Sequence, residues 1–355
     1  MTIAIDCRMI DSSGVGIYLK GCLPQFLQTN NNFILIGNNE KLKIFKTYKN
    51  VKIIECNIKP FSVLELFLFP IKIIRQVNSS DAYFVPFFNM PGGIKIPIYT
   101  TIHDIVFPDM PELTSKTGLA VRMWFFRRAY RKSQKIFTVS EFSKSRIESH
   151  LGNHRPVIVT HSAVQTIFFE YIATAEDIKK KETIVFIGNI KKHKGLECLI
   201  DAFLLVKNEK LPHKLIIIGS RNNFRTADND ILCKINSLGS GDVSFTGFIS
   251  DKQLMEYISQ ASLLVQPSLY EGFGLPPLEA MVLGTPALIS DIPVFKEIYE
   301  GFPVTFFRTG DSDDLKNKMI ELLLNKTPPY PVLSNDLIKK YSFEKTASII
   351  LKELK

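Results

Sequence analysis

Cysteine is scarce in this sequence of 355 residues, and it forms no recognisable motif. The five cysteines stand singly, without a CxxC pair or a tight Cys/His spacing, at Cys7, Cys22, Cys56, Cys198 and Cys233. That spacing argues against a structural zinc site. The odd number, without a secretory signal, favours reduced thiols and therefore a cytoplasmic protein.

Long hydrophobic runs and a signal peptide are also missing. The N-terminus has no basic segment followed by an apolar one. The most apolar stretch, Phe61–Ile74, is interrupted by Glu65, Pro70 and Lys72 and is shorter than the ~20 residues that span a bilayer. We therefore expect a chain that is soluble or, at most, peripheral on the inner face of the cell membrane.

Acidic residues are outnumbered by basic ones, which gives a formal net charge of +9. A basic excess fits nucleic acid, an anionic membrane surface or an anionic small ligand. No zinc-finger spacing, RNP-like strand or basic heptad region is present, so we expect no nucleic-acid partner. The stretch 116–135 combines Arg127, Arg128 and Arg131 with Trp124. This mixture favours contact with anionic headgroups, but it also fits a core-packing helix with a basic exposed face.

Short β-branched runs alternate with longer helical patterns along the chain. In the first half, strands are expected at 2–6, 33–36, 51–55, 82–86, 98–102, 136–139 and 157–160. In the second half, strands are expected at 183–187, 214–218, 243–246, 263–266 and 286–290. Two such series predict an α/β protein with two Rossmann-like, doubly wound domains that face each other across a cleft.

A polar segment with little periodicity separates the two series. We therefore expect a first domain over residues 1–165, a linker over 166–182 and a second domain over 183–340. Residues 341–355 should form a C-terminal helix that packs back on the first domain.

The segment 263–290 reads as a strand, a glycine-containing turn, a helix and a strand. Glycines in the turn let the backbone approach a ligand closely, and Pro276 suits the first turn of a helix. The start of that helix favours an anion such as a diphosphate. Glu271 precedes the turn and Glu279 lies within the helix, so both carboxylates could face one ligand. An isolated pair of this kind also fits a solvated Glu followed by a helical Glu that favours the helix dipole.

The segment EGFGLPPLE at 271–279 resembles the E-x7-E signature of retaining family 4 glycosyltransferases, which have the GT-B fold. VFIGNIKKHKGLECLIDAF resembles the glycine–basic–KG segment of that family, and FTGFISDKQL resembles its F-x-G segment. TIHDIVF and TVSEFSKSRI lie where the family has its donor-site histidine and a strand-to-helix turn. The resemblance covers most of the second half of the chain and extends more loosely into the first.

This resemblance implies roles for individual residues. Glu279 should accept hydrogen bonds from the ribose hydroxyls, and Glu271 should hold the sugar ring near its 3-hydroxyl. The backbone around Gly247–Phe248 should edge the base. The backbone of the glycine turn should face the sugar and the phosphates at Gly272, Phe273, Gly274 and Leu275.

Lys194 should neutralise the leaving diphosphate. The family commonly has an arginine directly after the glycine of the basic segment, whereas this sequence has Asn189. The second charge could come from Lys191, Lys192 or His193, or Asn189 could donate a neutral hydrogen bond. The sequence leaves these alternatives open.

In the first domain, Gly14 and Gly16 stand between the first expected strand and a helix. Alone they fit a bare tight turn; the resemblance implies that this loop approaches the donor phosphates and the acceptor. His103 and Asp104 follow another expected strand, and the resemblance implies that His103 holds the donor sugar. No metal-ligand pattern accompanies them, so we expect no metal and no cofactor.

Together these features predict a retaining glycosyltransferase that uses a nucleotide-diphosphate sugar. The acceptor would be a glycan or a polyprenyl-diphosphate-linked glycan of bacterial surface polysaccharide synthesis, at an anionic inner membrane surface. GDP-mannose, dTDP-rhamnose and UDP-hexoses all stay open as donors. Two alternatives are a nucleotide-sugar epimerase of the same fold and a non-catalytic partner subunit that binds nucleotide sugars.

Overall fold

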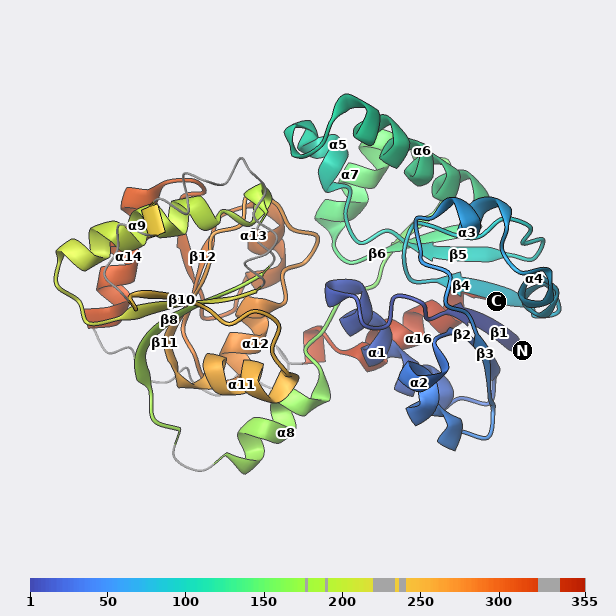
Figure 1. Ribbon diagram of the computed structural model, residues 1–355, viewed down its shortest axis with the longest axis horizontal. Coiled ribbons are helices and arrows are strands. Elements are labelled where there is room, and N and C mark those ends of the chain that lie inside the picture. Colours follow the sequence, from blue (N-terminus) through green and yellow to red (C-terminus); the bar gives the residue numbers. More distant parts are fainter. Residues whose placement is uncertain (176–177, 189–190, 220–233, 236–240, 325–338, 355) are drawn as a thin grey trace. The chain divides into compact units, whose positions relative to one another are not determined.

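The computed structural model describes residues 1–175, 178–188, 191–219, 234–235, 241–324 and 339–354. The chain divides into two compact units (Figure 1). Unit 1 contains residues 1–163 and 341–355, and unit 2 contains residues 164–340. Within the described ranges, no helix is long and apolar enough to cross a membrane.

The sheet of unit 1 is parallel throughout, with the described strands in the order β3-β2-β1-β4-β5-β6-β7. These strands are β1 (Thr2–Asp6), β2 (Asn32–Gly37), β3 (Val51–Glu55), β4 (Ala82–Val85), β5 (Ile98–Thr101), β6 (Lys135–Thr138) and β7 (Val157–Val159). In β1, Ile5 lies opposite Leu35 on one side and Phe84 on the other. The strand order reverses between β1 and β4, where ligands of doubly wound folds bind at the carboxyl ends of the strands.

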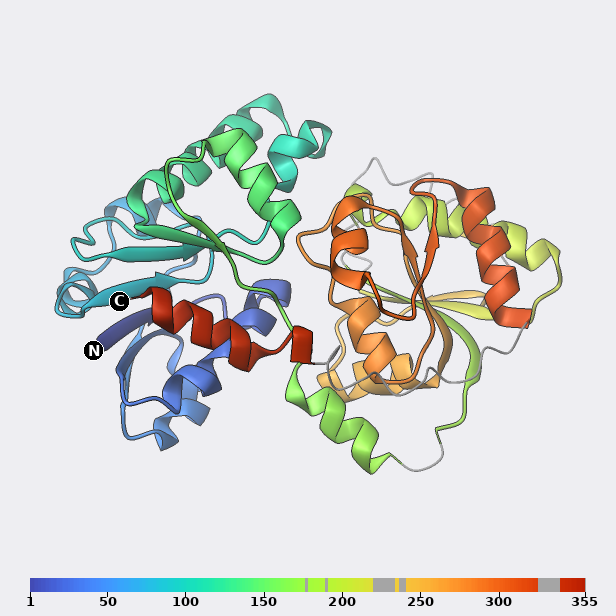
Figure 2. The same cartoon turned by 180° about the vertical axis from the view of Figure 1, so that it is seen from behind.

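Helices cover both faces of this sheet (Figures 1 and 2). They are α1 (Ser13–Leu27), α2 (Asn39–Leu42), η1 (Lys43–Thr47), α3 (Val63–Phe67), α4 (Ile71–Asn78), α5 (Val106–Asp109), η2 (Pro111–Leu113), α6 (Lys116–Lys132), α7 (Glu141–Leu151) and α16 (Phe343–Glu353). On one face α1 packs against α16, and a Cβ on Gly21 would lie only 2.2 Å from the Phe343 ring. On the other face, α4, α6 and α7 bury Ile73, Ala129 and Ile147.

The sheet of unit 2 is also parallel, with the described strands in the order β10-β9-β8-β11-β12-β13. They are β8 (Lys181–Ile187), β9 (Lys214–Ile218), β10 (Val243–Phe245), β11 (Ala261–Gln266), β12 (Ala287–Ser290) and β13 (Thr305–Phe307). The order reverses between β8 and β11. This second switch point positions the candidate site.

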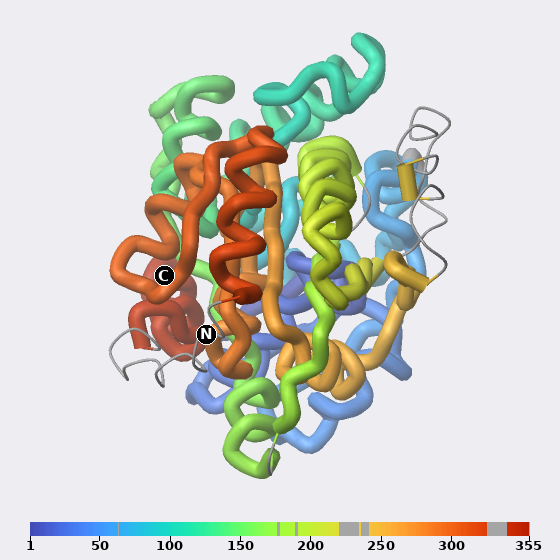
Figure 3. The backbone as a smooth tube through the Cα atoms, turned by 90° about the vertical axis from the view of Figure 1, so that its left-hand side faces the viewer, coloured from blue at the N-terminus to red at the C-terminus, as the bar shows by residue number. Residues whose placement is uncertain are grey.

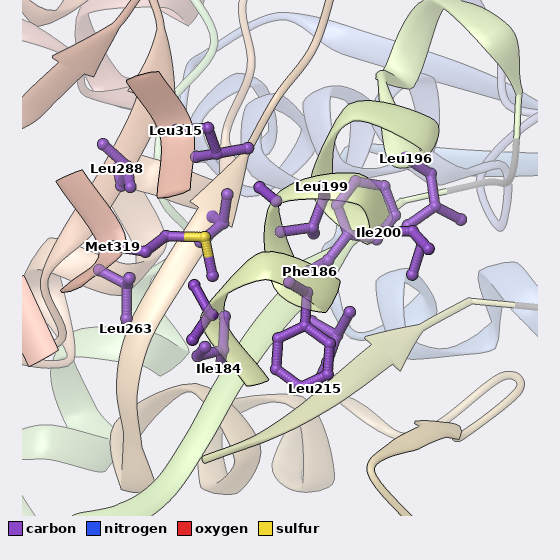
Figure 4. Packing of buried hydrophobic residues seen from close by; sticks show 14 of the residues in the cluster. Ile184, Phe186, Leu196, Leu199, Ile200, Leu215, Leu263, Leu288, Leu315 and Met319 are labelled. Atoms are coloured by element: carbon purple, nitrogen blue, oxygen red, sulfur yellow. The ribbon is translucent and has the colours of Figure 1, made fainter. Parts of the chain in front are cut away.

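The helices of unit 2 also form two layers. They are α8 (Thr166–Thr174), η3 (Lys192–Lys194), α9 (Leu196–Asn208), α11 (Asp251–Gln260), α12 (Pro276–Val282), α13 (Pro293–Tyr299) and α14 (Ser312–Leu324). Helices α9 and α14 lie side by side on one face of the sheet (Figure 3), while α11 and α12 lie on the other (Figure 1). Figure 4 shows the core beneath the first layer, where Phe186 of β8, Leu199 of α9 and Met319 of α14 are fully or almost fully buried.

Capping residues in the sequence explain where several helices begin. Ser250 and Gln253 form a capping box at α11, because each side chain accepts from the backbone N–H of the other, at 3.3 Å and 3.0 Å. Ser140 caps α7 by accepting from the Ser143 N–H at 3.0 Å. Ser342 caps α16 in the same way.

Each expected strand is present, with ends within two residues of the expectation. Strand β13 was not expected, because its three residues are too short for a period-two pattern. The segment 166–182 contains helix α8, with Phe168 buried, where an irregular linker was expected. The helix expected near 229–238 lies largely outside the described residues.

Candidate active site

The candidate active site of unit 2 lies at the carboxyl ends of β8 and β11, where the strand order reverses. Lys194 ends the short helix η3 that follows β8, and Glu271 lies between β11 and α12. The Lys194 Nζ lies 2.7 Å from both Glu271 carboxylate oxygens, and both side chains are largely buried. The fold therefore brings together two residues that the sequence separates by 77 positions.

Neighbouring side chains hold the Glu271 carboxylate in place. Ser268 donates its hydroxyl to Oε1 at 2.7 Å, and Gln266 donates its amide to the same oxygen at 3.4 Å. The Ser268 carbonyl in turn accepts from the Ser290 hydroxyl at the end of β12, at 2.5 Å. Sequence reasoning missed these residues, although a polar end to an otherwise apolar strand marks Gln266 and Ser268 as facing a ligand edge.

Backbone packing fixes the position of Lys194 relative to Glu271. The His193 carbonyl accepts from the N–H groups of Leu269 and Tyr270, at 2.8 Å and 3.3 Å. Gly195 has φ +69°, and a Cβ there would lie 1.8 Å from the Pro267 carbonyl oxygen. Only glycine allows the two loops to approach this closely.

His193 is neutral at neutral pH, because burial and then the Lys194 charge lower its pKa to about 4. It therefore cannot supply the second cation of the basic segment. Lys191 and Lys192 are exposed and stay as candidates. Asn189 lies outside the described residues.

The glycine turn before α12 is clamped by a buried tyrosine. The Tyr299 hydroxyl donates to the Gly274 carbonyl and accepts from the Leu278 N–H at 3.2 Å. Gly274 has φ +84°, and a Cβ there would lie 2.3 Å from the Phe295 ring. The clamp holds the backbone from Gly272 through Phe273 and Leu275, which the family resemblance predicts to face the sugar and phosphates. Tyr299 carried no signal in the sequence.

Glu279 is buried in α12, with a residue exposure of 4%. In the described part of the chain, its carboxylate has no hydrogen-bond or ion-pair partner. Burial, and then the negative charge of Asp251, raise its pKa to about 7. An uncompensated buried carboxyl group of this kind is suited to a ligand that donates hydrogen bonds, as ribose hydroxyls do.

Gly247 and Phe248 follow β10 at the same edge of the sheet. Gly247 has φ +70°, and its Cβ position is open. The Phe248 side chain is exposed, which leaves an aromatic face available beside this strand end.

His103 belongs to unit 1. His103 Nε2 lies 2.9 Å from the Pro86 carbonyl, which can only accept, so Nε2 carries the hydrogen. Burial lowers the pKa of the ring, which keeps it neutral and leaves Nδ1 as an acceptor. Tyr18 packs edge-on against the ring at 5.1 Å.

The sequence predicts that Gly14 and Gly16 form a loop before the helix, and this prediction is wrong. Both lie in the first turn of α1, and neither has a positive φ. A Cβ on Gly16 would lie 2.5 Å from the Ile10 carbonyl oxygen, so glycine is needed there for packing of the preceding loop. Gly14 is exposed and has open space around its Cβ position.

Residues 169–340 match the family model described as glycosyl transferases group 1. They form a group 1 glycosyltransferase domain. This domain covers most of unit 2 and includes every site residue predicted in the second half of the chain. The Lys194–Glu271 pair at the switch point thus lies within the group 1 domain.

Curated relatives agree with this assignment. O-antigen chain mannosyltransferase B of Escherichia coli is 28% identical over 227 residues, which cover 61% of this chain and 58% of that protein. Uncharacterized glycosyltransferase MJ1607 of Methanocaldococcus jannaschii is 34% identical over 221 residues, which cover 59% of this chain and 55% of the relative. The match therefore spans little more than half of the length of either relative.

Solved structures extend the likeness to the whole chain. Anabaena Alr3699/HepE in complex with UDP-glucose has a TM-score of 0.72 and 18% identity, covering 100% of this chain and 99% of that one. Sucrose-phosphate synthase of Thermosynechococcus elongatus has a TM-score of 0.76 and 15% identity, covering 99% and 98%. At these identities the likeness shows the fold alone, and it confirms the predicted GT-B class with two Rossmann-like domains.

Proposed function

We propose that the chain is a retaining glycosyltransferase of surface polysaccharide synthesis. It moves a hexose or deoxyhexose from a nucleotide-diphosphate sugar to a hydroxyl of a glycan or lipid-linked acceptor. The observation that carries this proposal is the Lys194–Glu271 pair, held beside the clamped glycine turn of a group 1 domain. A cation, a carboxylate and the backbone amides of a glycine turn at one strand edge fit a ligand that has both phosphate and sugar hydroxyls.

In the free protein, Lys194 and Glu271 neutralise each other. A bound donor replaces this contact with two of its own. The Lys194 ammonium pairs with the diphosphate, and Glu271 accepts from the sugar hydroxyls while Ser268 keeps it in place. Because negative charge grows on the leaving oxygen, the Lys194 contact strengthens in the transition state.

The rest of the donor is assigned to residues with matching polarity. Glu279 accepts from the ribose hydroxyls, the base lies along Gly247 and Phe248, and Lys191 approaches the phosphates. The Nδ1 atom of His103 accepts from a sugar hydroxyl. An acceptor atom at this position requires the neutral ring that the Pro86 contact and burial maintain.

The reaction needs no covalent nucleophile. The bond from the anomeric carbon to the diphosphate oxygen breaks, and the bond to the acceptor oxygen forms on the same face. The acceptor proton passes to the leaving diphosphate, whose charge Lys194 stabilises. The anomeric configuration is retained.

A thermal-shift screen of the purified chain against nucleotide sugars tests donor binding. GDP-mannose is tested first because several relatives are named mannosyltransferases, and UDP-glucose because it is bound in a structure of the same fold. A donor at 100 times its dissociation constant stabilises the fold by ~2.7 kcal/mol. If no nucleotide or nucleotide sugar shifts the transition, the donor assignment is wrong.

Incubation of the chain with its donor separates the alternative activities. An epimerase converts the donor alone into an isomeric nucleotide sugar, whereas a transferase requires the acceptor. A non-catalytic partner subunit binds the donor but turns nothing over by itself. We consider this last outcome because the sequence has Asn189 where the family commonly has an arginine.

The helix α6 is proposed to face an anionic inner membrane surface. The structure distinguishes the arginines of this helix by their contacts. Arg122 stacks on Phe107 at 4.2 Å, and Arg128 donates to the Met90 carbonyl at 2.7 Å. Lys116 and Lys132 are exposed on this helix, and so are Arg127 and Arg131, which line one cavity with Trp124 and are the cations proposed to meet phosphate.

A further inference from the structure

Unit 1 carries a second surface feature beside α6, formed by residues 61–71. This apolar ridge, as we call it, presents five large apolar side chains to solvent: Phe61, Leu64, Phe67, Leu68 and Ile71. Phe67 is 76% exposed and Leu68 is 67% exposed. So many exposed large apolar residues in one short segment mark an interaction surface rather than scattered surface residues.

The ridge is anchored, so the exposure of its side chains is built into the fold. Within it, Glu65 is buried and accepts from Arg8 at 2.5 Å and from the Phe61 N–H at 2.8 Å. Asn89 donates to the same carboxylate. The buried Phe69 ring stacks against Arg8, with 5.2 Å between the guanidinium carbon and the ring centroid. These contacts turn Glu65 and Phe69 inward, and between them Phe67 and Leu68 are exposed.

Along the chain segment that contains the ridge, the exposed charges have one sign. Between residues 57 and 80 the cations Lys59, Lys72 and Arg75 are exposed, and the single acid, Glu65, is buried in its pair with Arg8. Two copies of this surface would bring like charges together, which disfavours self-association. Apolar side chains among cations instead match the boundary between anionic headgroups and acyl chains.

Aromatic contacts join the ridge to α6. The Phe61 and Phe125 ring centroids lie 6.3 Å apart, and those of Phe125 and Trp124 lie 5.0 Å apart. Trp124 is 46% exposed. The ridge and the exposed side of α6 therefore form one surface.

On the other flank of Trp124, a cavity of about 520 Å³ opens between α6 and α7. Its lining includes Arg127, Arg131, His150 and His154, and none of its lining residues is acidic. The Asp109 carboxylate behind it contacts His150 Nε2 at 2.6 Å. The two arginines give this cavity charged donors of the kind that bind phosphate.

We propose that this surface docks on an anionic phospholipid bilayer. Leu64, Phe67, Leu68 and Ile71 enter the acyl boundary, Trp124 lies at the headgroup level, and the cavity of Arg127 and Arg131 receives a lipid phosphate. The proposal gives the peripheral membrane contact of the proposed function its inserting element. It does not depend on sugar transfer.

The sequence contains a single tryptophan, so Trp124 reports directly on docking. The full chain is titrated with vesicles of phosphatidylglycerol and phosphatidylcholine, and with vesicles of phosphatidylcholine alone. Anionic vesicles are expected to shift Trp124 emission to shorter wavelength, and brominated acyl chains are expected to quench it. Wild-type chain that gives neither signal with anionic vesicles overturns the proposal.

Paired variants separate the two parts of the surface. Phe67→Ser with Leu68→Ser should weaken vesicle binding by about tenfold or more, since both lose buried apolar area. Ile44→Ser, at a 64% exposed apolar residue of η1 in the same unit, is the matched control and should bind normally. Arg127→Gln with Arg131→Gln should lower the preference for anionic over neutral vesicles.

Two further outcomes would contradict docking on lipid. The first is equal vesicle binding by the Phe67→Ser, Leu68→Ser chain and the wild type. The second is a wild-type dimer in sedimentation equilibrium that the same variant dissociates, which would make the ridge a self-association surface. Transfer to a water-soluble acceptor should be unchanged in both variants, so failure of this inference is distinguishable from failure of the proposed function.

Discussion

Two carboxylates of the group 1 domain lie in opposite environments. Glu271 contacts Lys194 and Ser268 and has little freedom. Glu279 is buried in α12 with a pKa raised to about 7. In the proposed function, the first orients the donor sugar and the second accepts hydrogen bonds from the ribose.

The raised pKa of Glu279 predicts a pH-dependent donor affinity. Ribose hydroxyls donate more strongly to a carboxylate than to a carboxylic acid, so donor affinity should rise through about pH 7 and level off above it. Glu279→Ala should weaken binding, and Glu279→Gln should remove the pH dependence. Titration calorimetry between pH 5.5 and 8.5 checks this, and unchanged affinity in Glu279→Ala would refute the assignment.

The Glu279 carboxyl group also makes the stability of the fold depend on pH, but here a higher pH is unfavourable. The folded pKa lies above the ordinary value of 4.5, so the unfolded chain loses this proton first as pH rises. The free energy of unfolding should therefore fall between about pH 4.5 and 7, by up to about 3 kcal/mol. Glu279→Gln should flatten this part of the pH profile in urea unfolding, and an identical slope in wild type and variant would contradict the burial effect.

The second cation of the basic segment is testable residue by residue. His193 is neutral, so His193→Gln should keep the turnover number near that of the wild type. A large loss in either Lys191→Ala or Lys192→Ala would identify the cation that replaces the usual arginine. Asn189→Arg should be tolerated. Loss of turnover in His193→Gln, with donor binding intact, would show that the imidazole takes part.

At the scale of elements, the glycine turn depends on α13 as well as on its own sequence. Tyr299 joins the Gly274 carbonyl to the Leu278 N–H, and Phe295 fills the space beside Gly274. Tyr299→Phe leaves buried polar groups unpaired and should destabilise unit 2 by about 1–3 kcal/mol. Chemical unfolding measures the loss, and a change within experimental error would contradict the clamp.

Gly274→Ala should destabilise the fold by more than the positive φ of Gly274 alone would cause. Gly284→Ala is the matched control, because Gly284 also has a positive φ, +70°, but no atom within 4 Å of its Cβ position. The difference between the two variants isolates the clash with Phe295. Equal destabilisation of the two would show that Phe295 moves aside without penalty.

How far the sequence predicts these elements depends on the range of the interactions. Apolar β-branched runs predict the strands well because the burial pattern is local. Helix α8 was missed because the polar residues after it dominate the segment 166–182. Gly16 was taken for a loop residue because glycine disfavours a helix, whereas α1 already begins at Ser13.

The site was predictable in part for the same reason. The family resemblance of their motifs singles out Lys194, Glu271 and Glu279, and their proposed roles are still predictions. The contact between Lys194 and Glu271 and the Tyr299 clamp depend on how separate elements pack, which spacing along the chain does not encode.

For the whole molecule, the C-terminal helix links the end of the chain to the start. Helix α16 belongs to unit 1, and Phe343 packs against Gly21 and Tyr18 of α1. Phe343→Ala should destabilise unit 1 by about 3–5 kcal/mol. Trp124 is the only tryptophan and lies in unit 1, so the midpoint of its fluorescence transition should fall. An unchanged midpoint would contradict this packing.

The central claim is that Lys194 stabilises the diphosphate as it leaves. The most direct test is the turnover number of the purified chain, wild type against Lys194→Ala, at saturating donor with its acceptor. Because the contact strengthens in the transition state, the variant should lose ~10²–10³ in turnover, with a much smaller rise in donor KM. Turnover close to that of the wild type in Lys194→Ala would contradict the account.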